Sequence, residues 1–157
     1  MNLKKPDAVI FDLEGTLQMP TLINSSGKIS GPQLYKGAPE AVIDLSKRFP
    51  LFIVSNCHPR MLNNFLALPT MKGLFQDWTC YGETGLTKGQ NIISIIKRNN
   101  LKSPIYIGDS VGDFIATQEA QIPFLFIRHG EKTDSPNYPT FSDFGGVVDY
   151  IKKLESN

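Results

Sequence analysis

The sequence contains little cysteine and little histidine, with only two residues of each among 157. The cysteines, Cys57 and Cys80, lack the clustered spacing of a zinc site, and a chain of this length needs no disulfide to fold. We therefore expect neither a structural zinc site nor a disulfide framework. Cys57 lies close to one of the motifs described below, and we expect it to be a reduced bystander thiol rather than a nucleophile.

A strong excess of charge of either sign is also absent. Sixteen basic and 15 acidic residues give a formal net charge of +1, so neither a nucleic acid nor an anionic membrane surface is indicated as a partner. No apolar run approaches the ~20 residues that span a bilayer. The basic stretch 1–5 leads directly into a predicted strand, not into the apolar core of a signal peptide. We expect a cytoplasmic protein without a membrane partner.

Length and composition are ordinary for a globular protein. Hydrophobic residues make up 41% of the chain and charged residues 20%. The chain of 157 residues is long enough to bury a substantial core in one domain, and it contains no internal repeat or low-complexity segment. We predict a single domain over residues 1–157.

Short apolar runs alternate with segments of helical periodicity along the chain. Apolar runs bounded by polar residues predict strands at 8–11, 51–54, 78–81, 105–107 and 124–127. Apolar residues at helical spacing predict helices over 39–48, from Pro59, from the N-cap Thr87 to Asn99, from Gly112, and over 145–154. A Gly-Glu-Thr-Gly loop is expected at 82–85.

This alternation of strands and helices favours a parallel sheet built from β-α-β units. With right-handed crossovers, the strands form an α/β fold of the doubly wound, Rossmann-like type, with helices on both faces. Ligands of such folds bind beyond the carboxyl ends of the strands, at the point where the strand order reverses. A functional site is therefore expected at that edge of the sheet.

Four short motifs place chemically active side chains at or near those strand ends. They are Asp12-Leu13-Glu14-Gly15-Thr16 after the first strand, Ser55-Asn56 after the second, Lys88 at a helix start, and Gly108-Asp109-Ser110-Val111-Gly112-Asp113 after the fourth strand. Taken singly, each has an ordinary explanation as a turn former, a helix cap, a loop hydroxyl or a solvated lysine. Their joint occurrence on converging strand ends indicates a site for phosphoryl transfer.

Together these motifs resemble those of the haloacid dehalogenase-like (HAD) hydrolase superfamily, and the resemblance covers nearly the whole chain. One motif would be weak evidence, whereas four in the expected order are specific. The residues from Lys88 to Ile92, the pair Gly108-Asp109 and the stretch Gln121-Ile122-Pro123 are most similar to the phosphoglycolate phosphatase-like branch. The resemblance implies a Mg²⁺-dependent phosphatase that hydrolyses a phosphomonoester, with a small phosphorylated molecule as its partner.

The resemblance assigns Asp12 as the nucleophile that attacks phosphorus and forms an aspartyl-phosphate. It also implies Mg²⁺ ligands from Asp12, from the main-chain carbonyl of Glu14 and from Asp109. Asp113 would be a further ligand, or a partner that holds metal-bound water. Mg²⁺ prefers hard oxygen ligands, and its charge would offset the repulsion between the nucleophile and the phosphoryl group.

The remaining motif residues are expected to bind the phosphoryl group. The Ser55 hydroxyl would donate a hydrogen bond to a phosphoryl oxygen, and Lys88 would place a compact positive charge beside it. The backbone N–H groups of Leu13 and Asn56 would complete the site. Such donors stabilise the negative charge on the phosphoryl oxygens in the transition state.

Glu14 departs from the commonest form of the family motif, which has an aspartate here as the general acid and base. Glutamate supplies the same carboxyl group, but its extra methylene moves that group outward. The enolase-phosphatase branch has the same Asp-x-Glu-Gly-Thr pattern, so we interpret Glu14 as a working acid/base. The alternative is a catalytically weakened binding or regulatory protein on the same fold.

The segment between the first strand and helix 39–48 is too short for a large cap domain. Residues 18–35 are polar and rich in turn formers, and the tract 24–28 between Leu22-Ile23 and Ile29 favours a small hairpin. We predict a capless protein with an open site. Specificity would then come from the flap 18–35, from a partner subunit or from a large substrate.

Four polar side chains, those of Asn56, His58, Arg60 and His129, lie on predicted loops near the strand ends. Contact with a substrate is conceivable for each, but we expect ordinary solvated loop residues. No motif in these loops or in the flap identifies the substrate, and the oligomeric state is left open.

Two other protein classes with similar residues agree less well with the sequence. Receiver domains also combine aspartate, Mg²⁺ and lysine, but their phosphate acceptor follows the third strand, whereas Asp12 follows the first. Dehalogenases and phosphonate hydrolases replace the acid/base position with a residue that cannot transfer a proton, whereas Glu14 can. A phosphatase therefore agrees best with the motif.

Overall fold

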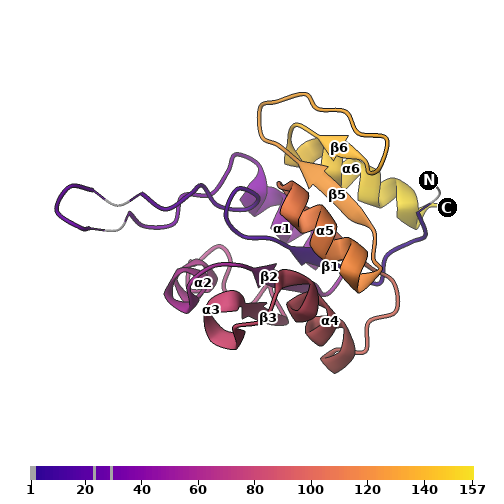
Figure 1. Cartoon of the computed structure of the whole chain (residues 1–157). Coiled ribbons are helices and arrows are strands. Elements are labelled where there is room, and N and C mark those ends of the chain that lie inside the picture. Colours follow the sequence, from indigo (N-terminus) through magenta and orange to yellow (C-terminus); the bar gives the residue numbers. More distant parts are fainter. Residues whose placement is uncertain (1–2, 23, 29) are drawn as a thin grey trace.

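A computed structural model of the chain describes residues 3–22, 24–28 and 30–157, and within them a six-stranded sheet forms the centre of the molecule (Figure 1). All neighbouring strands in it are parallel. The strands are β1 (Ala8–Phe11), β2 (Leu51–Ser55), β3 (Asp77–Cys80), β4 (Pro104–Gly108), β5 (Phe124–Ile127) and β6 (Thr140–Phe141). The predicted doubly wound parallel sheet is confirmed.

The strand order in the sheet is β3-β2-β1-β4-β5-β6. From β1 the chain adds β2 and β3 on one side, then crosses over and adds β4, β5 and β6 on the other. The order therefore reverses between β1 and β4, which pair with each other from Ala8↔Pro104 to Phe11↔Ile107. This is the switch point at which doubly wound folds bind their ligands.

The helices follow the strands as the periodicity predicts. They are α1 (Ala38–Ser46), α2 (Pro59–Leu66), α3 (Tyr81–Thr84), α4 (Lys88–Arg98), α5 (Val111–Ala120) and α6 (Phe144–Glu155). The predicted N-cap is confirmed, because the Thr87 side chain accepts a hydrogen bond from the Gln90 N–H and the Gln90 side chain accepts one from the Thr87 N–H. This reciprocal pair fixes where α4 begins, and hence the position of Lys88.

Helices cover both faces of the sheet, because side chains along each strand alternate between the two faces. On one face, Val9 and Phe11 of β1 pack in a core with side chains of α1, α2 and α6. On the other face, Ala8 and Ile10 pack in a second core with side chains of α4 and α5. All four β1 residues are buried, so the strand is apolar throughout, as expected for a central parallel strand.

Two short elements differ from the sequence prediction. The Gly-Glu-Thr-Gly segment is largely the single helical turn α3 and not a loop, and only Gly85, with a φ of 66°, ends it in the left-handed conformation. Strand β6 was not predicted, because two half-buried residues in a loop rich in Pro, Asp and Ser form no apolar run. It is a strand only through its pairing with β5, where Phe126 lies opposite Thr140.

The described residues 18–22, 24–28 and 30–35 form an arm that projects from the body of the molecule (Figure 1). Backbone hydrogen bonds join its two sides, from the Met19 N–H to the Gln33 carbonyl (2.8 Å) and from the Ser30 N–H to the Leu22 carbonyl (2.9 Å). A turn at its tip is closed by the Asn24 side chain, which accepts from the N–H groups of Ser26 and Lys28. The predicted hairpin is confirmed in these contacts, while Ile23 and Ile29 lie outside the described residues.

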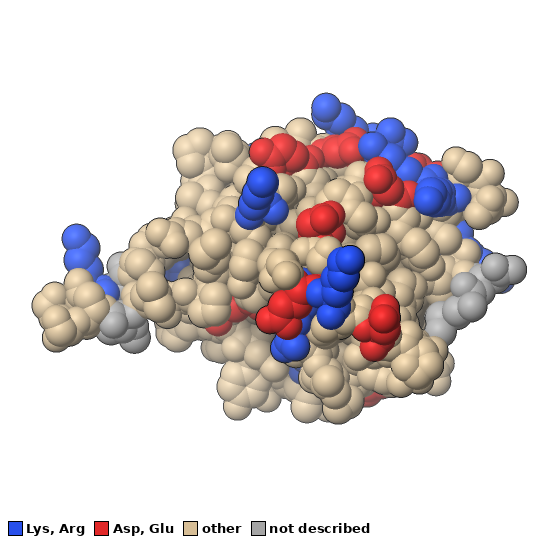
Figure 2. Space-filling model, turned by 90° about the horizontal axis from the view of Figure 1, so that it is seen from above, with Lys and Arg blue, Asp and Glu red and all other residues tan. Residues whose placement is uncertain are grey.

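No cap domain is present in the described part of the chain, where the arm is the one excursion between β1 and α1. On the face shown in Figure 2, basic and acidic side chains are interspersed and form no field of one sign. Among the residues that the structure describes, no helix combines the length and the apolar character needed to cross a membrane.

Candidate active site

Asp12 lies at the carboxyl end of β1, where the chain leaves the sheet. Its N–H donates to the Ile107 carbonyl of β4 (2.9 Å), and the residue is only 5% exposed. The next residue closes a tight turn, since the Leu13 carbonyl accepts from the N–H groups of Thr16, Leu17 and Gln18. The turn holds the motif against the end of β4 and brings Asp12 next to the second acidic motif.

Asp109 lies at the end of β4, on the strand beside that of Asp12. Its carboxylate accepts a hydrogen bond from the Thr16 hydroxyl (3.0 Å). Gly15 passes directly against it with a φ of 81°, and a Cβ on Gly15 would lie 2.0 Å from Asp109 Oδ2. The Gly-Thr pair of the first motif thus has two roles, because the glycine leaves space for this carboxylate and the threonine orients it.

Asp113 is completely buried in the first turn of α5. Its Oδ2 accepts from the backbone N–H groups of Asp109 (3.0 Å) and Ser110 (3.2 Å), while the Ser110 hydroxyl accepts from the Asp113 N–H. Gly108 makes this possible, since a Cβ there would lie 2.4 Å from Asp113 Oδ2. The spacing of the Gly-Asp-x-x-x-Asp motif therefore makes a capping box that fixes the loop carrying Asp109.

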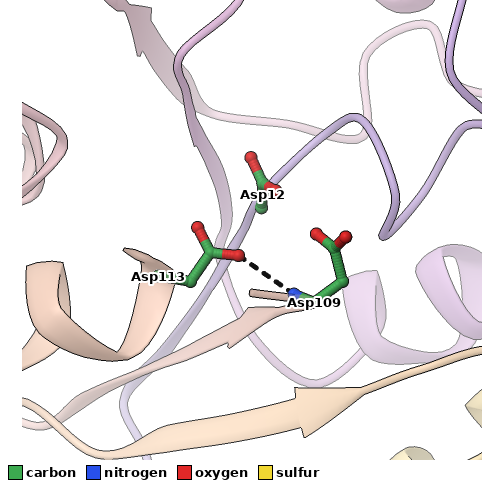
Figure 3. Close-up of side chains that lie close together, drawn as sticks. All are labelled: Asp12, Asp109 and Asp113. Atoms are coloured by element: carbon green, nitrogen blue, oxygen red, sulfur yellow. Dashed lines mark hydrogen bonds between the residues drawn. The ribbon is translucent and has the colours of Figure 1, made fainter. Parts of the chain in front are cut away.

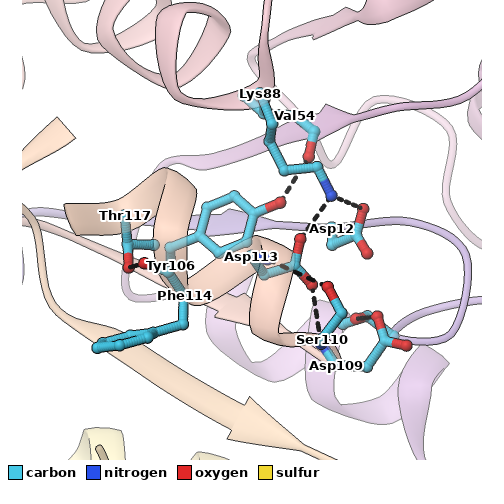
Figure 4. Close-up of polar contacts among 10 residues, drawn as sticks. Asp12, Val54, Lys88, Tyr106, Asp109, Ser110, Asp113, Phe114 and Thr117 are labelled. Carbon is cyan, nitrogen blue, oxygen red and sulfur yellow. Dashed lines mark hydrogen bonds and ion pairs between the residues drawn. The ribbon is translucent and has the colours of Figure 1, made fainter. Parts of the chain in front are cut away.

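Lys88 reaches from the first residue of α4 to the carboxylates (Figure 4). Its Nζ lies 3.2 Å from Asp12 Oδ1 and 2.5 Å from Asp113 Oδ1, and its side chain is 11% exposed. Burial lowers the pKa of Lys88, but the charges of Asp12 and Asp113 outweigh it, so the pKa is raised overall. The ammonium therefore stays charged and bridges the two aspartates.

The three aspartates form one cluster (Figure 3). Each of Asp12, Asp109 and Asp113 offers one carboxylate oxygen, and these oxygens all lie within 4.8 Å of one another. Burial and the nearby charge of Asp113 raise the pKa of Asp12 well above its usual range, against the opposing effect of Lys88. Burial also raises the pKa of Asp109. One ammonium thus faces three carboxylates, of which those of Asp12 and Asp113 are buried and that of Asp109 is half-buried.

The cluster has the properties of a site for a small divalent cation. With all three carboxylates ionised and Lys88 protonated, two negative charges lack compensation, which is the charge that Mg²⁺ would supply. The donors are hard oxygens, as Mg²⁺ prefers. Both oxygens of Asp113 already accept hydrogen bonds, so Asp12 and Asp109 are better placed than Asp113 to bind the ion directly.

The sequence also matches a known family. The family model described as haloacid dehalogenase-like hydrolase matches residues 22–127, which is more than half of the chain and includes Ser55, Lys88, Asp109 and Asp113. The chain belongs to the haloacid dehalogenase-like hydrolase family. The match begins after Asp12 and so does not include the first motif. The position of that motif is known from the structure, where it lies at the switch point of the sheet. No curated protein sequence matches the chain.

Several solved structures share the fold of this HAD hydrolase. A HAD-superfamily hydrolase from Ehrlichia chaffeensis is 18% identical, with a TM-score of 0.79 over 98% of this chain and 99% of that one. A subfamily IA, variant 1 hydrolase from Geobacter sulfurreducens is 15% identical, with a TM-score of 0.75 over 96% and 98%. 3-Deoxy-D-manno-octulosonate 8-phosphate phosphatase from Moraxella catarrhalis is 19% identical, with a TM-score of 0.73 over 98% and 90%. At these identities the likeness concerns the fold.

The residues expected to bind a phosphoryl group lie around the cluster of this HAD hydrolase. Ser55 is the last residue of β2, the strand next to β1, and is buried, while Asn56 after it is exposed. The Leu13 side chain is buried in the core, so only its backbone can face a ligand. Neither Ser55 nor Asn56 has a side-chain hydrogen bond to the aspartates or to Lys88 among the described residues.

The Glu14 side chain contacts the arm. Its Oε1 accepts two hydrogen bonds from Thr21, one from the N–H and one from the hydroxyl, both 3.2 Å long. The side chain also lines a cavity of about 550 Å³ between the arm and α2. The sequence predicts that the extra methylene moves this carboxyl group outward. In the structure the carboxyl group contacts the arm and lies in the wall of the cavity.

A solvated loop position was expected for four polar side chains. Asn56, His58 and Arg60 are exposed, as expected, and His129 is half-buried. His129 packs in the structure, with its ring stacked on Tyr35 (3.8 Å between centroids) and its Nε2 2.9 Å from the Thr16 carbonyl. His58 caps α2, since its Nδ1 accepts from the Arg60 N–H (3.1 Å). Arg60 lies in α2 and not on a loop, and both His58 and Arg60 line the cavity.

The cysteine near the site is a core residue. Cys57 is buried among apolar side chains, and this burial raises the pKa of its thiol to about 11. A thiol with such a pKa is almost entirely protonated at neutral pH and is a poor nucleophile. No disulfide joins it to Cys80, which is also a free, buried cysteine.

Sequence reasoning assigned no role to two residues that support the site. Thr16 orients Asp109, and its place in the Gly-Thr pair directly after the carboxylates was a signal for this. Tyr106 is fully buried on β4, and its hydroxyl donates to the Val54 carbonyl at the end of β2 (2.8 Å). It ties together the strands on either side of β1, but nothing in its sequence context distinguishes it from an apolar core residue.

Proposed function

We propose that this HAD hydrolase is a Mg²⁺-dependent phosphatase that hydrolyses a phosphomonoester through an aspartyl-phosphate on Asp12. The observation that supports this best is the cluster of Asp12, Asp109 and Asp113 with Lys88, at the switch point of the sheet. A buried nucleophilic carboxylate beside a fixed ammonium is the arrangement that phosphoryl transfer requires.

Asp12 and Asp109, with the main-chain carbonyl of Glu14, would hold Mg²⁺, and Asp113 would position the loop and any metal-bound water. The bound ion would supply positive charge that keeps Asp12 ionised and offsets the charge of the phosphoryl oxygens. Without it, burial raises the pKa of Asp12 and weakens the nucleophile. Because the site has low polarity, binding of the ion and ionisation of Asp12 would favour each other.

In the first step, an oxygen of Asp12 attacks phosphorus, and the bond between phosphorus and the leaving alcohol oxygen breaks. Glu14, protonated at this stage, gives its proton to that oxygen. Lys88, the Ser55 hydroxyl and the N–H groups of Leu13 and Asn56 would stabilise the charge on the phosphoryl oxygens.

In the second step, the ionised Glu14 takes a proton from water, and the resulting oxygen attacks the phosphorus of the aspartyl-phosphate. The bond to Asp12 breaks, inorganic phosphate leaves and Asp12 returns as a carboxylate. Glu14 ends the cycle protonated, so no proton is gained or lost by the enzyme.

A phosphatase assay with p-nitrophenyl phosphate, with and without Mg²⁺, tests this function. We expect turnover that EDTA abolishes and that Asp12→Asn lowers at least ~10³-fold, as is usual when a nucleophile is removed. A panel of phosphorylated metabolites at fixed Mg²⁺ then defines the substrate. Turnover that survives Asp12→Asn would mean a different nucleophile. Lack of wild-type turnover with p-nitrophenyl phosphate and with every member of the panel would favour the binding or regulatory alternative.

The comparisons support the type of reaction, not the choice of substrate. The Moraxella catarrhalis structure, a phosphatase of 3-deoxy-D-manno-octulosonate 8-phosphate, contains magnesium, phosphate and KDO. We take from it that this fold can serve a metal-dependent phosphatase of about this size, since the two chains cover 98% and 90% of each other. For this chain the substrate has to be inferred from its own residues.

A further inference from the structure

The cavity beside Glu14 has the size of a small-molecule site. It has a volume of about 550 Å³ and lies between the arm and α2, within the range of ~300–1,000 Å³ for ligand pockets. Residues of the arm form one wall and residues of α2 the other. The residues that line it are Glu14, Gln18, Thr21, Ser30, Gly31, Pro32, His58, Arg60, Met61 and Asn64.

Glu14 is the residue of the Asp12 motif that lines this cavity. It stands two residues after Asp12 and lines the cavity, whereas Asp12, Asp109 and Lys88 do not. On the proposed function, on which this inference rests, Glu14 gives its proton to the oxygen of the departing alcohol. That alcohol must therefore lie on the Glu14 side of the phosphoryl group, which is the side of the cavity.

Arg60 places a positive charge on the α2 wall, at an exposed position. The other arginines, Arg48, Arg98 and Arg128, each form an ion pair with a carboxylate. Within the described part of the chain, Arg60 has no such partner, and it is the only lysine or arginine that lines the cavity. A guanidinium in this position matches a carboxylate on a ligand, to which it can donate two parallel hydrogen bonds.

The remaining polar groups are suited to a ligand with hydroxyl groups. Gln18 is 1% exposed and lines the cavity, and its Oε1 is buried without a hydrogen-bond partner among the described residues. Buried polar atoms are rarely left unpaired, and a donor on a ligand would satisfy this one if the Gln18 side chain turned toward the cavity. His58 accepts at Nδ1, which leaves Nε2–H as a donor, and Asn64 lies one turn after Arg60.

The walls do not suit a nucleobase or another aromatic leaving group. None of the described residues that line the cavity is Phe, Tyr or Trp, and His58 supplies the only aromatic ring among them. Bases and aryl groups are bound mainly by stacking on aromatic faces. An aliphatic ligand that carries hydroxyl groups agrees better with these walls.

We propose that the cavity binds the alcohol portion of a small, aliphatic, hydroxylated phosphomonoester that bears a carboxylate, and that Arg60 determines this specificity by pairing with the carboxylate. The phosphoryl group would lie at Asp12 and Lys88, and the carboxylate at the α2 end of the cavity. Glu14, between them, would act at the ester oxygen.

Two matched pairs of esters test this specificity, since the members of each pair differ only in a carboxylate against a hydroxymethyl group. The pairs are 3-phosphoglycerate with glycerol 3-phosphate, and 6-phosphogluconate with sorbitol 6-phosphate. We expect a higher kcat/KM for the acid in at least one pair. Arg60→Gln should lower that value about 10- to 100-fold, mainly through KM, because a hydrogen bond to a charged group contributes about 1.5–3 kcal/mol. Hydrolysis of the neutral partner should change less than about threefold.

Two control variants separate the charge from its position. Arg60→Lys keeps the charge but not the bidentate geometry, and should recover part of the preference for the acid. Lys72→Gln removes one positive charge from an exposed position that does not line the cavity, and should leave the ratio of acid to neutral ester unchanged.

The outcomes distinguish this inference from the proposed function. Hydrolysis of p-nitrophenyl phosphate without a preference for either acid, or a preference that Arg60→Gln leaves intact, would overturn the role of Arg60 while the phosphatase activity stands. A failure to hydrolyse any of the esters, including p-nitrophenyl phosphate, would overturn the proposed function and the assignment of the cavity with it.

Discussion

Thr21 donates two hydrogen bonds to the same oxygen of Glu14, one from its backbone N–H and one from its hydroxyl, each 3.2 Å long. Thr21 belongs to the arm (Figure 1) and Glu14 to the turn after β1, so this contact joins the arm to the proposed acid/base. The position of the Glu14 carboxyl group is therefore set by the arm. Several of the expected effects of mutation follow from this contact.

Substitution of Glu14 tests its role in proton transfer. Glu14→Gln cannot give or take a proton and should lower kcat about 10²- to 10⁴-fold. Glu14→Asp keeps the carboxyl group but withdraws it by one methylene from Thr21, and should retain an intermediate activity. Steady-state kinetics with p-nitrophenyl phosphate measure both variants. Full turnover of the Gln variant would rule out the acid/base role.

Substitution of Thr21 tests whether the arm positions Glu14. Thr21→Val keeps the shape but removes the hydroxyl, and should lower kcat about 5- to 10-fold, as expected for the loss of a hydrogen bond of about 1 kcal/mol. Thr21→Ser keeps the hydroxyl and should stay close to the wild type. If the effect acts through Glu14, Thr21→Val should have little further effect in a Glu14→Gln background, and additive losses would contradict the coupling.

Mg²⁺ should stabilise the folded protein, because it would bind a cluster that only the folded chain assembles. At a concentration 100 times its Kd the free energy of unfolding should rise by about 2.7 kcal/mol. Asp109→Asn should abolish this increase, whereas Asp134→Asn, an exposed loop position, should keep it. Thermal unfolding with Mg²⁺ or EDTA measures the difference. A response to Mg²⁺ that survives Asp109→Asn would place the ion elsewhere.

The metal-free protein should become more stable when Asp12 is neutralised. Burial and the Asp113 charge raise the pKa of Asp12 in the folded state, so the folded state binds this proton more tightly than the unfolded chain. The wild type therefore gains stability as the pH falls through the folded-state pKa towards the unfolded value of ~3.9. In EDTA at pH 7, Asp12→Asn should be more stable than the wild type by about 0.5–2 kcal/mol.

Urea denaturation at several pH values measures this effect. The advantage of Asp12→Asn should shrink as the pH is lowered, because the wild-type carboxyl group then also becomes neutral. Asp149→Asn, at an exposed position of α6, should show no comparable gain at pH 7. A wild type that is more stable than Asp12→Asn in EDTA at pH 7 would contradict the unbalanced charge of the cluster.

Two glycines with nearly the same φ, 81° at Gly15 and 77° at Gly27, make a controlled test of the close approach at Asp109. A Cβ on Gly15 would collide with the Asp109 carboxylate, whereas a Cβ on Gly27, at the tip of the arm, would meet nothing within 4 Å. Gly27→Ala should cost only the ~1–2 kcal/mol of left-handed strain. Gly15→Ala should cost more and should also lose the stabilisation by Mg²⁺. Equal effects of the two substitutions would argue against the packing of Gly15 on Asp109.

The sequence was sufficient to predict the features that depend on the local pattern of residues. Buried parallel strands appear as apolar runs, so the ends of β1 and β4, and with them Asp12 and Asp109, could be located. The Thr87–Gln90 capping box is likewise local, which is why the start of α4 could be predicted from four residues.

Features that depend on distant contacts could not be predicted. Strand β6 exists only through its pairing with β5, and the contact of Glu14 with Thr21 depends on how the arm leaves the sheet. Arg60 appeared to be a solvated loop residue because nothing in its neighbourhood reveals that α2 faces the arm across a cavity. The carboxylate cluster could be predicted because a parallel sheet brings strand ends together. No such rule predicts that a cavity forms between the arm and α2.

The tip of the arm offers a position for protein engineering. Its turn is closed by its own residues, through the Asn24 side chain, and Gly27 has open space around it. Exposed, self-contained loop tips of this kind tolerate insertions well. A fluorescent protein inserted at 25–26 would leave the sheet untouched, while its linkers would continue into the two sides of the arm, one of which carries Thr21. Such a fusion could report occupancy of the cavity as a change in fluorescence, without a chromogenic substrate.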